Sequence, residues 1–217
     1  MKTISNIQSK TTEKNVILSD SNNSAAMIPF YNEKTFLTNS IKYIKFIKNV
    51  EAQVRTSKEY SAYIRYLKED LDPPLNHCMV YSNIKDDNAP IEMHHHILTL
   101  FDIVEIITTR FFKNDTPFSS SRIFHEVMEE HRLNRILVVM LCKAVHEAVH
   151  NRINPRFLDY RMGHGDIVGF LEEYWDCLSL THIKKIQMYI ESHKKFTTDG
   201  LPNSFFEEVV TRWNKEV

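Results

Sequence analysis

Apolar residues recur at every third or fourth position through most of this 217-residue chain, a spacing that places them on one face of an α-helix. Helices are therefore expected over residues 32–70 (in two pieces that join near Ser57), 99–112, 118–132, 167–177, 181–195 and 204–213. Pro73 and Pro74 end the first of these regions, because proline lacks the backbone N–H that would continue a helix. With 42% hydrophobic residues, the chain can bury a substantial core.

One stretch departs from the helical pattern. Residues 77–97 have β-forming residues on both sides of a polar turn at 85–88, which predicts a short hairpin whose second strand runs into a histidine tract. The apolar run 136–141 leads directly into 143–152 and is compatible with a buried strand or with the start of a helix. The expected fold class is therefore mainly α (α+β), with a small β element embedded between helices.

The same patterns divide the chain into four segments. Residues 1–30 are rich in Ser, Asn, Thr and Lys and are expected to form a flexible N-terminal tail. An N-terminal helical segment (31–75), a core segment (76–160) with a helical insertion (97–133), and C-terminal helices (161–217) follow.

Composition excludes several classes of protein. No run approaches the ~18 apolar residues of a membrane span, and the N-terminus lacks the apolar segment of a signal peptide, so no membrane partner is expected. Three scattered cysteines suit a reducing cytoplasm rather than a disulfide framework. Because 27 Lys and Arg residues face 28 Asp and Glu residues, a nucleic-acid partner would need a local basic patch or a metal ion.

The histidines are the most informative residues. The chain has 11, of which seven lie between residues 94 and 150. His146 and His150 are four positions apart in a segment of helix-forming residues, so they share one helical face and can bind one divalent ion together. The tract at the end of the predicted strand can supply a third imidazole. A site with three ligands keeps open positions for water and substrate, as a catalytic metal requires.

These residues also carry a resemblance to a known family. The segments IEMHH (91–95) and LCKAVHEAVH (141–150), with Asn134 between them, resemble the signature of HNH endonucleases, which have a ββα-metal element. The long helical insertion and the segment DIVGFLEEY (166–174) resemble in particular an HNH-like protein group of large bacteriophages. The resemblance spans roughly residues 46–195, and its specific part is the histidine-bearing segments.

The resemblance implies a phage-encoded, metal-dependent endonuclease of the host cytoplasm that hydrolyses phosphodiester bonds in nucleic acid, with DNA as the expected partner. It implies metal ligation by His94, His146 and His150, and a general base, His95, that deprotonates the attacking water. A free imidazole with a pKa near 6.5 is suited to that role at neutral pH. Three nitrogen ligands favour zinc, whereas Mg²⁺ and Mn²⁺ prefer more oxygen ligands. The sequence leaves the choice among these three ions open.

Supporting roles follow from the same comparison. Glu92 and Glu147 are candidates to orient the ligand imidazoles. The family asparagine corresponds to Asn134, or its place is taken by His131. If the strand register slips by one residue, His95 and His96 take the roles given above to His94 and His95.

Two other functions remain open on the sequence. The pattern His146-Glu147-x-x-His150 also matches the zinc metalloproteases, in which the glutamate is the general base and downstream carboxylates such as Glu172 and Asp176 assist the site. Residue 153 is not the glycine of the longer metzincin pattern. The third reading is an HNH-derived phage protein that keeps its metal for stability. It would bind nucleic acid, or a phage or host protein, without cutting it.

Overall fold

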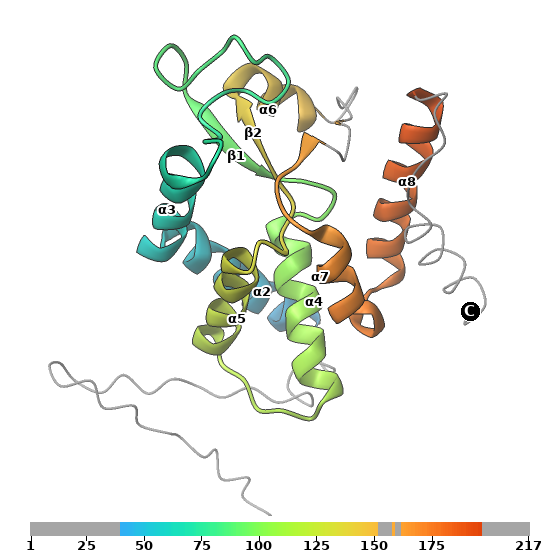
Figure 1. The fold of residues 1–217 in the computed structure, drawn as a ribbon. Coiled ribbons are helices and arrows are strands. Elements are labelled where there is room, and N and C mark those ends of the chain that lie inside the picture. Colours follow the sequence, from blue (N-terminus) through green and yellow to red (C-terminus); the bar gives the residue numbers. More distant parts are fainter. Residues whose placement is uncertain (1–39, 152–157, 159–161, 197–217) are drawn as a thin grey trace, which may run out of the picture.

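The computed structural model describes residues 40–151, 158 and 162–196, and over these residues the fold is mainly α with one small antiparallel sheet (Figure 1). This confirms the expected fold class. None of the described helices is both long and apolar enough to cross a membrane. The expected tail over 1–30 and the expected helix over 204–213 lie outside the described residues.

The elements follow one another with short connections, apart from the segments between η1 and β1 and between α6 and α7. In chain order they are α2 (Ser40–Thr56), α3 (Lys58–Arg65), the π-helical turn η1 (Tyr66–Asp70), β1 (Ile91–His95), α4 (Leu100–Lys113), α5 (Ser120–Arg132), β2 (Val138–Cys142), α6 (Lys143–Val149), α7 (Ile167–Glu173), the 3₁₀ turn η3 (Trp175–Cys177) and α8 (Leu180–Phe196).

Side-chain caps set several of these boundaries. The Ser57 hydroxyl accepts a hydrogen bond from the Tyr60 N–H and begins α3 where the sequence predicts it. Thr99 and Asp102 form a reciprocal capping box at the start of α4.

The sheet differs from the expected hairpin. β1 pairs with β2 in antiparallel register, with His94 opposite Val139, and the segment before β1 contributes only an isolated bridge between His77 and Lys85. All five residues of β2 are buried, so a continuous apolar run here is a strand covered on both faces. By sequence, the apolar run 136–141 is compatible with a strand or with the start of a helix. The structure has a strand there, β2, which runs directly into α6.

A large apolar core joins the helices. Buried residues of α2, α4, α5, α7 and α8 belong to one cluster, which therefore includes both helices of the insertion. A second, smaller cluster covers β1, β2 and α6. Figure 1 shows this sheet and α6 at one end of the molecule, with α4, α5 and α7 below them. α6 therefore packs on the sheet, as part of the smaller cluster, and not within the large core.

Candidate metal centre

Three imidazoles converge where the sheet meets α6. His94 lies on β1, His146 on α6, and His150 directly follows α6. One possible ligand atom from each lies within 4.8 Å of the other two. The ring centroids are 5.3 Å apart for His94 and His146, 5.0 Å for His94 and His150, and 4.8 Å for His146 and His150. This imidazole cluster is the set of metal ligands that the sequence predicts.

Local connectivity explains the convergence. α6 begins at the residue after β2, and β2 pairs with the strand that carries His94. His146 and His150 are one helical turn apart, so both face the same side of α6. The sheet register therefore brings a strand residue and a helix face together although an insertion separates them in the sequence.

A hydrogen bond fixes the orientation of one ring. Nδ1 of His146 lies 2.5 Å from Oε2 of Glu92, so the ring N–H donates to the carboxylate. In the neutral ring this leaves the lone pair on Nε2, which lies 3.1 Å from Nε2 of His150. Two nitrogen ligands of a tetrahedral zinc ion are ~3.3 Å apart, as follows from Zn–N bonds of ~2.0 Å. The two rings are thus already spaced as ligands, and Glu92 occupies the supporting place expected for it.

The surroundings of His94 and His150 favour their neutral form. Burial, together with the neighbouring imidazoles of His146 and His150, lowers the pKa of His94 to about 3. Burial also lowers the pKa of His150, again with a contribution from His146. Metal ligation needs unprotonated imidazole, so this environment favours the ligating form. His94 is buried whereas His150 is exposed, and the cluster therefore reaches solvent on its His150 side.

The expected general base lies on the other face of the strand. Successive strand residues point to opposite faces, so when His94 joins the cluster, His95 turns away from it. His95 is buried with its ring stacked on Tyr60, at 6.1 Å between centroids. Its Nε2 lies 3.0 Å from Nε2 of His131, whose Nδ1 lies 2.7 Å from the carbonyl oxygen of Val127.

These contacts define the proton positions. A carbonyl oxygen only accepts, so Nδ1 of His131 carries a proton and its Nε2 accepts the proton of His95 Nε2. The basic nitrogen of His95 is then Nδ1. Burial lowers the pKa of His95 well below its ordinary value and lowers that of His131 to about 4. The pair is a neutral, buried hydrogen-bonded unit on the core side of β1.

The remaining candidates are placed as follows. Asn134 lies in the turn after α5 with φ +54°, and its buried side-chain oxygen has no hydrogen-bond partner among the described groups. Glu147 is exposed, with Oε1 3.9 Å from Nζ of Lys143. His96 is buried with its ring 5.0 Å from that of Tyr189, so the slipped register is not adopted. Of these three, none joins the imidazole cluster.

The carboxylates of the protease reading lie elsewhere. Glu172 is exposed on α7, and a carboxylate oxygen of Asp176 lies 3.5 Å from Nζ of Lys113 at the end of α4. Figure 1 shows α7 and α6 at different levels of the molecule. Neither carboxylate belongs to the imidazole cluster.

A second polar group, which no sequence pattern predicts, links α4 to α8. Ligand atoms of Asp102, Glu105 and His182 lie within 4.8 Å of one another. The N–H of Ser179 donates to Nδ1 of His182, so the ring proton is on Nε2, 3.2 Å from Oε2 of Glu105. Lys185 places Nζ 2.6 Å from both carboxylate oxygens of Asp102. With these partners the group is a helix–helix link; its signal in the sequence is only the capping box before α4.

Comparison with known proteins gives one result. The sequence model of a family described as "Bacteriophage G278-like virion protein" matches residues 1–216. Searches among curated proteins and among solved structures found no match.

Proposed function

Because this chain belongs to the family of bacteriophage G278-like virion proteins, we propose that it is a virion component that binds one divalent metal ion, zinc by its ligand chemistry. The ligands are His94, His146 and His150. The observation that carries the proposal is the convergence of three imidazoles from a strand and a helix, one of them oriented by Glu92.

The role assigned to the ion is to fasten α6 to β1. Among the described residues, a small apolar cluster and the Glu92–His146 hydrogen bond link these elements, and metal binding to the native state adds its binding free energy to their stability. At a free zinc concentration of 100 times the dissociation constant, that gain is ~2.7 kcal/mol.

The test is metal analysis of the purified full chain after zinc loading and removal of excess ion. We expect one zinc per chain in the wild type and none in His146→Ala. His125→Ala, which removes an exposed histidine of α5 outside the imidazole cluster, should keep the ion. Replacement of zinc by Co²⁺ should give the visible absorption of a four-coordinate site. A wild type that retains no zinc, or a His146→Ala variant that retains as much as the wild type, would contradict the proposal.

A second candidate is the metal-dependent endonuclease. The strand–strand–helix order of β1, β2 and α6, together with the exposed ligand His150, favours it. A bound ion would stabilise charge on the scissile phosphate. His94, His146 and His150 would hold it, and Nδ1 of His95 would take the proton of the attacking water. The inward position of His95 is the observation against this role, which is why hydrolysis ranks second.

Cleavage assays separate the two candidates. Plasmid DNA and single-stranded RNA are incubated with the full chain loaded with zinc, Mg²⁺ or Mn²⁺. For an HNH-type enzyme, both His94→Ala and His95→Gln abolish cleavage, and His95→Gln keeps its zinc. Undiminished cleavage by His95→Gln would remove the base assignment. If neither nucleic acid is cut, the non-catalytic reading stands, in which the metal-stabilised protein binds nucleic acid or a phage or host protein.

The protease reading ranks third, because Glu147 faces solvent beside Lys143. Its test is casein hydrolysis, which Glu147→Gln should abolish if this reading is correct.

A further inference from the structure

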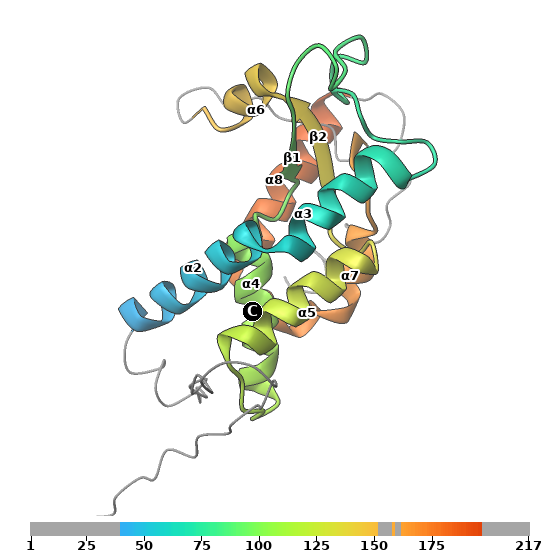
Figure 2. The ribbon, with the colours of Figure 1, turned by 90° about the vertical axis from the view of Figure 1, so that its left-hand side faces the viewer.

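The first half of α2 exposes an amphipathic stripe. Ile41, Ile44, Lys45 and Lys48 occupy positions i, i+3, i+4 and i+7, so they share one helix face. Ile41 is 78% exposed and Ile44 is 44% exposed. The helix uses another face to pack on the core, through Phe46, Ile47, Val50 and Val54. Figure 2 shows the first turns of α2 extending beyond the helices on which it packs.

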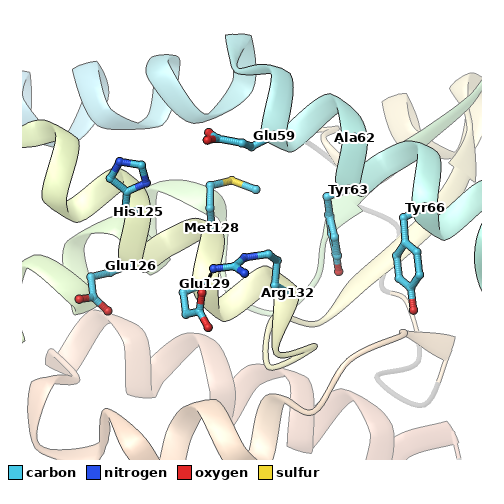
Figure 3. A pocket seen from close by; sticks show the side chains of 9 residues that line it. All are labelled: Glu59, Ala62, Tyr63, Tyr66, His125, Glu126, Met128, Glu129 and Arg132. Carbon is cyan, nitrogen blue, oxygen red and sulfur yellow. Dashed lines mark hydrogen bonds and ion pairs between the residues drawn. The ribbon is translucent and has the colours of Figure 1, made fainter. Parts of the chain in front are cut away.

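A groove with complementary chemistry lies between α3 and α5. Its volume is about 760 Å³, within the ~300–1,000 Å³ of ordinary ligand pockets. Figure 3 shows Tyr63 and Tyr66 on one side and Met128 on the other, and these side chains with Ala62 give the groove its apolar lining. Tyr66 is 39% exposed. The groove is therefore a place where an apolar side chain would lose contact with water.

The rims of the groove are acidic. Glu59 lies on the α3 side, and Glu126 and Glu129 lie on the α5 side. Arg132 forms an ion pair with Glu129 and neutralises it. Within the described part of the chain, no ion pair involves Glu59 or Glu126. Two carboxylates on opposite walls are thus left to attract cations.

We propose that the α2 stripe of one copy of this chain docks in the α3–α5 groove of a second copy. In helix-in-groove recognition the residues at i, i+3, i+4 and i+7 face the groove; the stripe has this spacing, with isoleucines at the first two positions and lysines at the last two. The isoleucines would contact the aromatic and methionine lining, and Lys45 and Lys48 would meet Glu59 and Glu126. The proposal uses none of the cluster histidines and does not depend on metal binding.

The two surfaces are different, so the contact is head-to-tail. A docked pair still presents one free stripe, on one copy, and one free groove, on the other, so growth continues until a ring closes or a filament forms.

The experiment measures the molar mass of the full chain by size-exclusion chromatography with light scattering at increasing concentrations. We expect the wild type to exceed one chain and to grow with concentration, and raising the salt to about 0.5 M should reduce the association, because the Debye length then falls well below 10 Å. Lys45→Glu/Lys48→Glu should be monomeric. Glu59→Lys/Glu126→Lys should also be monomeric.

Mixing these two variants gives the sharpest readout. The first keeps a native groove and the second a native stripe, and the changed stripe and the changed groove carry exchanged charges, so the mixture should associate although each variant alone is monomeric. A chain with all four changes has its charges exchanged and should associate again. The control is Lys85→Glu/Lys184→Glu, which makes the same charge change at exposed lysines outside the stripe and should associate like the wild type.

Circular dichroism of each variant establishes that it is folded. A wild type that is monomeric at every concentration would overturn the proposal, and the groove would then have another occupant. Variants that associate as strongly as the wild type, or a mixture that stays monomeric, would overturn it equally.

Discussion

The hydrogen bond between His95 and His131 should make the folded protein sensitive to mild acid. The only lone pair of His131 that can take a proton is on Nε2, which accepts the proton of His95, so protonation breaks that bond. Burial lowers the pKa of His131 to about 4, whereas an unfolded chain has the ordinary value of about 6.5. As the pH falls, the unfolded chain binds the proton first. Stability is therefore lost from about pH 6.5 downward until the folded state also titrates near pH 4.

The linkage relation gives the size of the effect. Between about pH 7.5 and about pH 5, a shift from about 6.5 to about 4 removes about 2 kcal/mol of the free energy of unfolding. His131→Gln removes the titrating group and keeps a side chain that can form hydrogen bonds. The wild type should then lose about 2 kcal/mol more than this variant between the two pH values.

Urea unfolding followed by circular dichroism at both pH values, with chelator present, measures the difference. The chelator keeps the imidazole cluster free of metal. The cluster then makes the same contribution to the pH dependence of stability in every protein compared. His125→Gln, the same change at an exposed position of α5, should lose as much stability as the wild type. An equal loss in the wild type and in His131→Gln would refute the reasoning.

Three further predictions concern single contacts. Glu92→Gln should weaken zinc binding about 10- to 100-fold in a competition assay with a chromophoric chelator, because the ligand ring beside it loses its anionic partner; unchanged affinity would remove that role. Gly165→Ala should lower the urea stability by at least about 2 kcal/mol, because Gly165 has φ +120° and a Cβ there would clash with the Ile136 carbonyl oxygen; a neutral effect would contradict this geometry. Tyr174→Phe should cost about 1–3 kcal/mol in the same assay, since its hydroxyl donates to the buried Glu130 carboxylate at 3.0 Å; a variant as stable as the wild type would show that this bond contributes nothing.

Local signals predict most of the helices because their causes are local. The expected helix over 99–112 is observed as Leu100–Lys113, since Thr99 and the apolar spacing both lie within the segment. The helix expected over 118–132 begins at Ser120, because the Ser119 hydroxyl, rather than that of the nearby Thr116, caps it by accepting the Arg122 N–H. Serine and threonine both cap helices, so composition alone does not choose between neighbouring candidates.

The hairpin is wrong for a different reason. The polar turn at 85–88 does form, and the Lys85 N–H donates to Oδ1 of Asn88. The strand that follows it nevertheless pairs with β2, which lies beyond the whole insertion. A turn signal reports only on adjacent residues, whereas strand pairing is decided by which apolar surface is available after the helices have packed.

For the candidate site too, the features with a local cause could be predicted and the others could not. The spacing of His146 and His150 is a helical property and is sufficient to place both rings together. Alternation along β1 predicts that His94 and His95 face opposite sides. Which side is the core is set by His131 and Tyr60, which come from two other helices. No pattern within 91–95 contains that information, and this is why the buried position of His95 could not be predicted.

The packing of the insertion, which contains α4 and α5, helps to bring β1 and β2 together. A backbone hydrogen bond of 2.9 Å from the His96 N–H to the Leu137 carbonyl joins its two ends, and its helices belong to the large core together with α2. Bringing β1 and β2 together across the insertion costs loop-closure entropy. Packing of the insertion's helices in the large core offsets this cost without a metal ion. A metal at the imidazole cluster would act after this step, because His146 and His150 lie on and beside α6, outside the large core. Removal of the ion should consequently increase hydrogen exchange in α6 and leave the exchange of α4 unchanged.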